Sequence, residues 1–247
     1  YKAQLHVVPH HLSHAASAFL VSPFETAAIL TADSRGEWTT VALAQGRDNS
    51  VKIIDQICLP NSLGHLYTAI TEYLGFGAHA EYQVMGLAAY GKPIYKDFFF
   101  NKIVKLLEKG RFELNPDYFS FYSKNYWKTL EPFIGPGRRD ENEPITDRHM
   151  NIASSIQKVL EEIVLHITHY LYQITGEQNL CIAGGVGLNS VMNYHLQKNS
   201  PFNDIFIQPA SNDDGNALGS AFYIHNTILG NPRTFVMEDV DFGPGFS

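Results

Sequence analysis

Residues 27–57 have the sequence AAILTADSRGEWTTVALAQGRDNSVKIIDQI, which contains three short β-prone runs. The runs cover residues 27–32, 39–44 and 51–57, and each consists largely of apolar or β-branched side chains. Turn-forming residues separate them, with Ser-Arg-Gly at 34–36 and Gly-Arg-Asp-Asn at 46–49. Strands joined by such short turns predict an antiparallel meander.

The sequence predicts two helices after this meander. Residues 62–74 predict a helix that ends at Gly75, because apolar or aromatic side chains recur along one side of it. The clearest helical pattern extends from a cap at Asp147 to a stop at Gly176, with apolar residues spaced three and four apart. Both predicted stops use glycine, the residue that most easily adopts the left-handed conformation at a helix end.

An irregular segment and two strand-helix units complete the predicted order. Residues 95–145 are rich in aromatic residues, proline and glycine, and predict an inserted subdomain with one helix near 98–109. The sequence then predicts a strand at 179–183, a glycine turn that opens a helix, a strand at 204–208 and a last helix at about 213–229. A meander followed by alternating helices and strands predicts an α/β fold, with a mixed β-sheet flanked by helices. The same order occurs in one lobe of the actin-like ATPase superfamily (ASKHA, ribonuclease H-like), which includes sugar kinases and heat-shock ATPases.

The composition is that of an ordinary globular protein. The chain has 247 residues, of which 45% are hydrophobic and 17% charged, and a net charge of −7. This charge argues against nucleic-acid binding as the main purpose, since a phosphate backbone requires clustered Lys and Arg. Cys58 and Cys181 lie in apolar runs, which predicts two buried thiols in a reducing compartment.

The ends of the chain and its hydropathy add two expectations. No apolar run reaches the roughly 18 residues of a membrane span, and no signal peptide is visible, so we expect a cytoplasmic protein. The chain begins with Tyr1 rather than Met, so we expect a piece of a longer protein.

Four side chains suggest a site for a divalent metal. His10 and His14 are four residues apart, a spacing that brings two imidazoles onto one face of a helix. Asp33 ends the first predicted strand, and Asp213 follows the predicted strand at 204–208. Two histidines with two carboxylates suit Fe²⁺ or Zn²⁺. Asp33 also fits a simple hairpin turn, and Asp213 a helix N-cap.

Glycine-rich turns follow two of the predicted strands. Gly184-Gly185-Val186-Gly187 would let the backbone approach an anion at a helix N-terminus, where free N–H groups favour negative charge. The same glycines also suit a plain turn, and the pattern is neither the G-x-G-x-x-G nor the P-loop motif. Asp213-Asp214-Gly215-Asn216 forms the second junction. Both turns would lie at the carboxyl edge of the sheet, the usual ligand position in open α/β folds.

Eight short motifs occur in order along nearly the whole chain. They are HHLSHAASAF (10–19), SPF (22–24), TAD (31–33) with GE (36–37), GHLY (64–67), LGF (74–76), VMGLAAYG (84–91), AGGVGLNS (183–190) and DDGNALG (213–219). Together they closely resemble the NodU/CmcH family of O-carbamoyltransferases, whose members carbamoylate nodulation factors, aminoglycosides and cephalosporins. Only the insertion at 95–145 adds little to the resemblance.

The resemblance implies a two-part enzyme. Its N-terminal part is similar to the tRNA threonylcarbamoyl-transfer subunit, which has the actin-like fold. Its C-terminal part is similar to the YrdC-like domain, which makes carbamoyladenylate from carbamoyl phosphate and ATP. By this comparison, residues 1–25 end a truncated first lobe, residues 26–232 form the second lobe with the insertion, and residues 233–247 are a linker toward a YrdC-like domain absent from this chain.

The implied reaction moves a carbamoyl group from carbamoyladenylate to a hydroxyl of a small-molecule or sugar acceptor, with the help of a metal. The implied partners are therefore the adenylate, the acceptor and the YrdC-like domain, with neither nucleic acid nor membrane among them. A homodimer is left open.

The resemblance also implies roles for single residues. The metal ligands would be His10, His14, Asp33 and Asp213, and the nucleotide-binding residues Gly184, Gly185, Val186 and Asn189, with Gly215 and Asn216 beside them. Catalysis would involve His11 or Asp33 as the group that deprotonates the acceptor hydroxyl, and spacing alone does not choose between them.

Three positions differ from the family pattern. Ser34 replaces the usual glycine, Asp214 a usual small residue, and Gln83 a usual lysine. The last change removes a positive charge that glutamine does not replace.

Other functions are open at this stage. A nucleotide hydrolase or kinase of the same fold would give the paired histidines no role. A non-catalytic or ATP-binding actin-like relative, used as a binding or assembly module, agrees with Gln83 and with the missing partner domain. A metallopeptidase is excluded, because no Glu follows the first histidine as in H-E-x-x-H.

Overall fold

The computed structural model describes residues 4–119, 126–138, 142–241 and 243. In chain order, its elements are α1 (His10–Phe19), β1 (Thr26–Gly36), β2 (Thr39–Arg47), β3 (Ser50–Cys58), α2 (Leu63–Tyr73), α3 (Glu81–Ala88), α4 (Lys96–Phe98), η1 (Phe99–Ile103), β4 (Val104–Leu106), β5 (Phe112–Leu114), α5 (Tyr126–Ile134), α6 (Asp147–Thr175), β6 (Asn179–Ala183), η2 (Gly185–Leu188), α7 (Ser190–Asn199), β7 (Asp204–Ile207), α8 (Asp214–Phe222) and η3 (Tyr223–Ile228). Of these, η1 and η3 are π-helical and η2 is a 3-10 helix.

A five-stranded sheet with the order β3-β2-β1-β6-β7 forms the centre of the fold. β1, β2 and β3 make the predicted antiparallel meander, and β6 and β7 continue the sheet on the other side of β1 as parallel strands. The predicted α/β class with a mixed sheet is therefore confirmed. Because β1, β6 and β7 are parallel, their carboxyl ends meet at one edge of the sheet.

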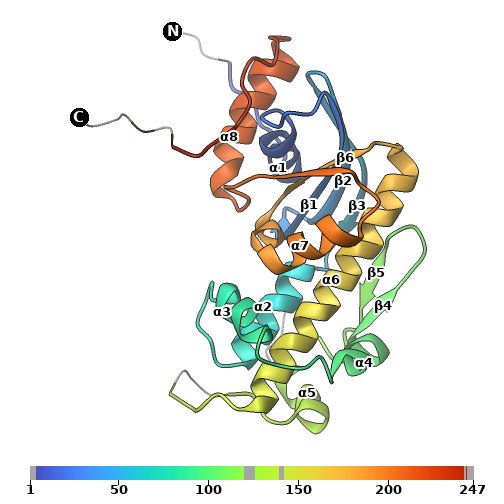
Figure 1. The fold of residues 1–247 in the computed structure, drawn as a ribbon, viewed down its shortest axis with the longest axis vertical. Coiled ribbons are helices and arrows are strands. Elements are labelled where there is room, and N and C mark those ends of the chain that lie inside the picture. The colour runs from blue at the N-terminus through green and yellow to red at the C-terminus, as the bar shows by residue number, and fades with distance from the viewer. Residues whose placement is uncertain (1–3, 120–125, 139–141, 242, 244–247) are drawn as a thin grey trace.

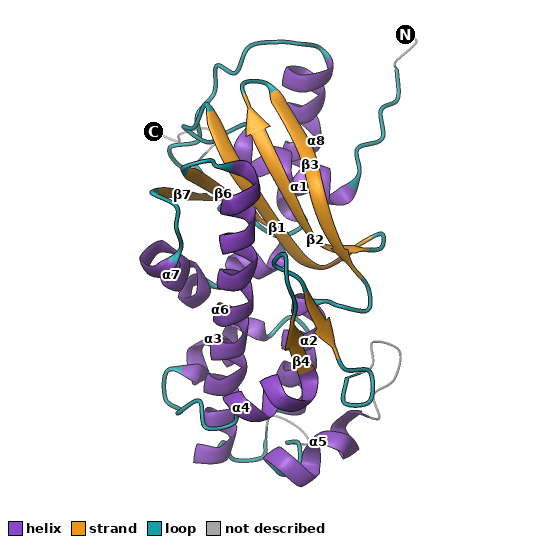
Figure 2. Ribbon diagram, turned by 90° about the vertical axis from the view of Figure 1, so that its right-hand side faces the viewer, coloured by secondary structure: helices purple, strands orange, loops and turns teal. Residues whose placement is uncertain are grey.

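Helices cover both faces of this sheet, as Figure 1 and Figure 2 show. α1 and α8 lie on one face, and the long helix α6 crosses the other. Alternate residues of β1 face the two cores: Ala27 and Ile29 pack with α1, whereas Ala28 and Leu30 pack in the core that contains α6. This double burial explains why β1 is apolar on both sides.

The predicted helix stops are confirmed. Gly75 follows α2 with a φ of 76°, and Gly176 ends α6 with a φ of 66°. The start of α6 differs by one residue: Thr146 rather than Asp147 is the N-cap, because its backbone N–H donates to Nδ1 of His149 and closes the first turn. Within the described ranges, the structure contains no helix with both the length and the apolarity needed to cross a membrane.

The insertion differs from the prediction in two respects: it contains a second helix, α5, that was not predicted, and the predicted helix is shorter than expected. The helix expected at 98–109 stops at residue 103, since β4 follows at once and pairs with β5 in a small antiparallel hairpin. The hairpin turns at Lys109 and Gly110, which both have positive φ. Its buried side chains join the core that contains α6, so the insertion extends that core.

One of the two cysteines is not buried as expected. Cys181 lies in β6 and is fully buried, but Cys58 ends the edge strand β3 and is exposed. Exposed and buried residues alternate along much of β3, as in a strand packed on one face only.

After η3, the chain contacts the C-terminal end of α1 through the side chain of Arg233. The five N–H groups of its guanidinium donate to the backbone carbonyls of Phe19, Leu20, Ser22, Phe24 and Asp48, at 2.8–3.2 Å. The guanidinium also lies 4.4 Å from the centre of the Phe19 ring. Carbonyls at the C-terminal end of α1 thereby gain partners from outside the helix.

The predicted division into domains is not decided by this arrangement. α1, from the range expected to end a first lobe, packs on the five-stranded sheet. Residues 1–3, 242 and 244–247 lie outside the described residues. The boundaries at 25 and 232 stay predictions.

Candidate metal centre

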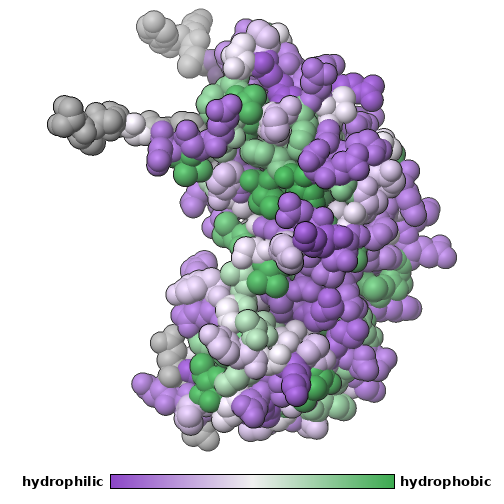
Figure 3. All heavy atoms as spheres, in the orientation of Figure 1, coloured by the Kyte–Doolittle hydropathy of each residue, from purple (hydrophilic) through white to green (hydrophobic). Residues whose placement is uncertain are grey.

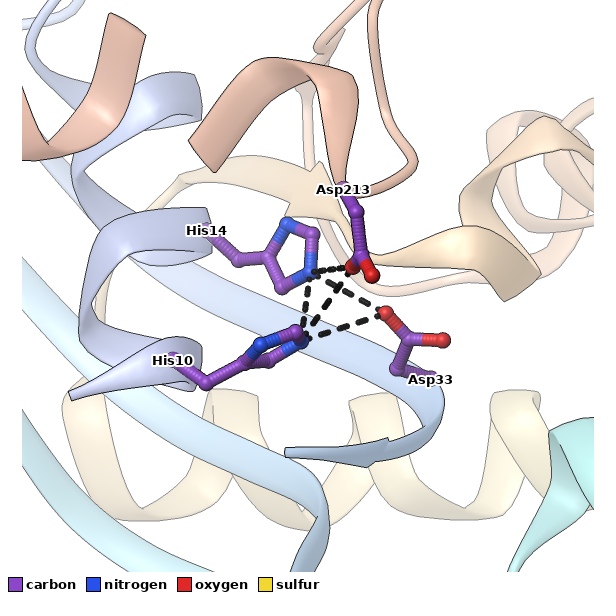
Figure 4. Close-up of side chains that lie close together, drawn as sticks. All are labelled: His10, His14, Asp33 and Asp213. Atoms are coloured by element: carbon purple, nitrogen blue, oxygen red, sulfur yellow. Dashed lines mark hydrogen bonds and ion pairs between the residues drawn. The ribbon is translucent and has the colours of Figure 1, made fainter. Parts of the chain in front are cut away.

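Four side chains converge at the carboxyl edge of the sheet, as Figure 4 shows. They are the four predicted metal ligands: His10 and His14 from α1, Asp33 from β1, and Asp213 from the loop before α8. The Nε2 atoms of the two histidines are 3.0 Å apart, and Nε2 of His14 is 3.0 Å from Oδ2 of Asp33. Both Nε2 atoms are 3.4 Å from Oδ1 of Asp213. All four ligand atoms lie within 4.8 Å of one another.

Local backbone geometry places these ligands. α1 begins at His10, so the four-residue spacing points both imidazoles from one face of the helix. β1 is irregular between Ala32 and Gly36, and in this bulge Asp33 points toward α1. Gly36 lies against the His10 ring, where a Cβ atom would overlap the imidazole.

The donor set and its spacing fit a divalent metal. Two imidazole nitrogens this close repel each other through their lone pairs unless a proton or a cation lies between them. Two nitrogens and two carboxylate oxygens match the ligands of tetrahedral Zn²⁺ and of ferrous iron. His14 is fully buried and Asp33 nearly so, whereas the Asp213 side chain is 66% exposed. The cluster therefore opens to solvent at Asp213.

The electrostatics favour an ionised Asp33. Burial alone would raise the pKa of Asp33, but hydrogen bonds from the two histidines and from the Ser34 N–H hold it well below its usual range. The hydrogen bond with Asp33 in turn raises the pKa of His10. A negative charge is thus present in the cluster throughout the neutral pH range.

His11 lies beside the cluster, but its ring nitrogens are engaged elsewhere. Its Nδ1 is 2.7 Å from the Thr31 hydroxyl, and its Nε2 is 3.0 Å from the Thr39 carbonyl. Burial lowers the pKa of His11 to about 4, which keeps the ring neutral. In this arrangement His11 joins α1 to β1 and β2.

The predicted glycine turn lies directly against the cluster. Gly184 has a φ of 91°, and a Cβ there would overlap the carbonyl oxygen of Ala32. At Gly185, a Cβ would lie 3.1 Å from Oδ1 of Asp33. Both positions leave no room for a larger residue without a shift of β1 or of the Asp33 carboxylate.

A cavity of about 380 Å³ adjoins this turn. Four predicted site residues line it: Asp33, Gly185, Val186 and Asn189. The opposite wall comes from α2 and α3, through Tyr67, Thr68, Glu81, Tyr82 and Met85. Figure 3 shows the molecule indented at mid-height, between the α8 region above and the α3 region below.

Besides Gly184, two further predicted nucleotide-binding residues do not line the cavity. Gly215 is buried at the start of α8, where a Cβ would overlap the carbonyl oxygen of Ala210. Asn216 contacts two of the predicted metal ligands, with its Nδ2 3.3 Å from Nε2 of His14 and 3.5 Å from Oδ1 of Asp213. Their contacts are with the α8 junction and the cluster, and a role toward a nucleotide stays a prediction.

The α2–α3 wall of the cavity was missed by the sequence prediction. The hydroxyl of Thr68 donates to Glu81 at 2.5 Å, so α2 and α3 present these side chains together. No sequence spacing indicates this contact. Asn212, which also lines the cavity, precedes Asp213 and could have been found from the same junction. Gln83 is not among the lining residues, and its Nε2 donates to the Tyr82 hydroxyl.

These features define the class of protein: a mixed α/β domain with two histidines and two aspartates clustered beside a cavity at the carboxyl edge of its sheet. Residues 1–222 match the family described as the carbamoyltransferase N-terminus, and the chain belongs to this family.

Three relatives are similar over most of this chain. The chain is 44% identical over 238 residues to an uncharacterised protein of Synechocystis sp.. It is 36% identical over 242 residues to nodulation protein NolNO of Sinorhizobium fredii, and 34% identical over 242 residues to nodulation protein NolO of Bradyrhizobium diazoefficiens. The matches cover 95%, 98% and 95% of this chain but 38%, 34% and 41% of the relatives. The chain therefore spans less than half the length of these proteins.

A solved structure is also similar. The crystal structure of HypF from T. kodakarensis matches with a TM-score of 0.46 and 17% sequence identity, covering 93% of this chain and 38% of that chain.

Proposed function

We propose that this chain is the carbamoyl-transfer domain of an O-carbamoyltransferase. Its reaction would move a carbamoyl group from carbamoyladenylate to a hydroxyl of a small-molecule or sugar acceptor. The observation that supports this most is the His10, His14, Asp33 and Asp213 cluster lying against the glycine turn of the cavity. Membership of the carbamoyltransferase N-terminus family indicates the class of reaction.

The four clustered side chains would hold the divalent metal, Fe²⁺ or Zn²⁺. When bound, it would supply positive charge that stabilises the negative charge developing on the AMP leaving group. Two observations support such a site: His14 is fully buried, and the Ser34 N–H donates to the Asp33 carboxylate. At Gly185, the missing side chain would let the phosphate approach the backbone.

The transfer step forms one bond and breaks another. The acceptor oxygen bonds to the carbamoyl carbon, the bond from that carbon to the phosphate oxygen breaks, and AMP leaves with the electron pair. The acceptor hydroxyl also loses its proton, which would pass to solvent water at the open side of the cluster. Asp33 lines the cavity and His11 uses both ring nitrogens on β1 and β2. In this proposal Asp33 therefore accepts the hydrogen bond of the attacking hydroxyl.

The proposal also covers the fold of this domain and its partner domain. The sheet would be the second lobe of an actin-like fold, which the antiparallel meander followed by parallel strands supports. A YrdC-like domain would supply carbamoyladenylate from carbamoyl phosphate and ATP. The homodimer and the cytoplasmic location stay predictions.

Transfer from supplied carbamoyladenylate tests the proposal. The chain is loaded with Zn²⁺ or Fe²⁺ and mixed with carbamoyladenylate and a panel of aminoglycosides and oligosaccharides, and carbamoylated products are measured by mass spectrometry. We expect His14→Ala to lower product formation roughly 100-fold, because the buried cluster loses a ligand. His169→Ala, on the exposed side of α6, is the matched control and should leave the rate unchanged. Metal and AMP binding without any product would instead favour the binding module.

A further inference from the structure

Gln157 lies behind the cavity and contacts two of the residues that line it. It belongs to α6 and is 3% exposed. Its Oε1 accepts hydrogen bonds from the Tyr67 hydroxyl at 2.9 Å and from Nδ2 of Asn189 at 2.8 Å. Its Nε2 donates to Oδ1 of Asn189 at 3.0 Å and to Oε1 of Glu161 at 3.2 Å.

These four bonds use the whole capacity of the carboxamide. An amide oxygen has two lone pairs and an amide nitrogen two hydrogens, and each has a partner here. The reverse orientation would place the NH₂ group against the Tyr67 hydroxyl and the Asn189 NH₂, and the oxygen against the Glu161 carboxylate. Glutamate would lose both donated bonds, and methionine would lose all four. The surroundings therefore specify glutamine and its orientation.

The two cavity-lining partners of Gln157 belong to different parts of the cavity wall. Tyr67 comes from α2, while Asn189 ends the glycine turn and caps α7 by accepting from the Met192 N–H at 2.8 Å. Tyr67 gives its only hydroxyl proton to Gln157, so this hydroxyl has no further hydrogen to donate. Gln157 therefore ties the end of the glycine turn to α2.

We propose that Gln157 is a positioning residue for the ligand of this cavity. It holds Tyr67 and Asn189 in the orientation that binds the adenylate, and it does not itself line the cavity. This inference rests on the proposed function, since the adenylate is the donor of that reaction.

AMP affinity, metal content and thermal unfolding distinguish positioning from general stability. AMP binding to the metal-loaded chain is measured by isothermal titration calorimetry, in the wild type and in Gln157→Met. We expect Gln157→Met to weaken AMP binding about tenfold or more, because buried polar groups of Tyr67 and Asn189 lose their partner. The metal content should not change, since Gln157 touches none of the four ligands.

Gln45→Met is the matched control. Gln45 is also partly buried, and its Nε2 donates to Glu177 at 2.6 Å. It pairs with Ala28, near the end of β1 opposite to Asp33. This variant should lower the unfolding temperature while AMP affinity stays within about twofold of the wild type.

A double mutant tests whether Gln157 acts through its neighbour. Gln157→Met combined with Tyr67→Phe should weaken AMP binding by less than the sum of the two single effects, because both remove the same hydrogen bond. If Gln157→Met does not fold, Gln157→Glu takes its place in the measurements of AMP affinity and metal content, because it loses both donated bonds. It keeps the bond from Tyr67, so Tyr67→Phe should then add its own full effect. Wild-type AMP affinity in the folded variant would overturn the inference alone. A wild-type chain that fails to bind AMP would overturn the proposed function and this inference with it.

Discussion

Gly36 and His10 are in such close contact that one methyl group should disturb the metal centre. A Cβ at residue 36 would overlap the His10 ring, so Gly36→Ala must displace the imidazole or β1. We expect metal affinity to fall at least about tenfold, as measured by competition with a chelating dye. Gly86→Ala in α3 is the control, because no atom beyond its chain neighbours and its own helical backbone lies within 4 Å of the added methyl. It should leave metal affinity unchanged and stabilise the fold by about 0.5–1 kcal/mol. A folded Gly36→Ala variant with normal metal affinity would show that His10 is not needed in its present position.

Removal of single ligands tests the cluster directly. We expect wild-type chain to bind one divalent metal, and His10→Ala, His14→Ala and Asp213→Ala each to bind it more weakly. The Asp213 variant should lose least, since this side chain is the most exposed of the cluster. Elemental analysis after loading and desalting measures the stoichiometry. An unchanged ratio in all three variants would rule out the site.

At the scale of elements, the first turn of α6 should make stability depend on pH. His149 accepts the Thr146 N–H with Nδ1 and must be neutral to do so. Burial, together with the positive charge of Arg148, lowers the pKa of His149 below its usual value. Since the folded pKa is below the unfolded one, this stabilisation is complete above about pH 6.5 and is lost as the pH falls through the lowered value.

The variant His149→Gln separates the effect of His149 on stability from the titration of the other histidines. Glutamine at the third helical position can accept the same N–H and does not titrate. We expect the decrease in free energy of unfolding between pH 7 and pH 5, measured by urea denaturation, to be smaller in His149→Gln. An identical decrease in both proteins would mean that the cap does not titrate in this range.

The elements that were predicted correctly are those with local signals. Gly75 and Gly176 end their helices through a backbone conformation that glycine itself favours, and β6 matches the predicted bounds of 179–183. β4 was predicted as helix, because three residues are too short for a strand pattern and their pairing with β5 depends on burial against α6.

The residues of the candidate site also divide into those with a local sequence signal and those without one. His10, His14 and Asp33 could be selected from spacing and from the end of a strand. Tyr67, Glu81 and Gln157 could not be selected from spacing, because their meeting depends on how α2, α3 and α6 pack. Tertiary contacts of this kind leave no periodic signal in the sequence.

At the scale of the whole molecule, the proposal divides two reactions between two domains. This chain alone should not make carbamoyladenylate, although a full-length protein that contains it should carbamoylate a hydroxyl acceptor. Pyrophosphate release from carbamoyl phosphate and ATP, followed with and without metal, is the measurement. Metal-dependent release by this chain at the rate of a full-length protein would place adenylate formation within these residues and contradict the division.

The contacts of Arg233 have a practical consequence for anyone choosing an expression boundary. A chain cut after residue 232, the end that the family resemblance implies for the second lobe, would lose the guanidinium that joins five carbonyls around the end of α1. α1 is also the helix that presents His10 and His14. We expect the shorter chain to melt earlier and to bind metal more weakly than one cut after residue 241, with calorimetry and dye competition as readouts. A truncation after residue 232 would thus loosen the helix that carries two of the candidate metal ligands, and a loss of metal in such a product would result from the chosen boundary.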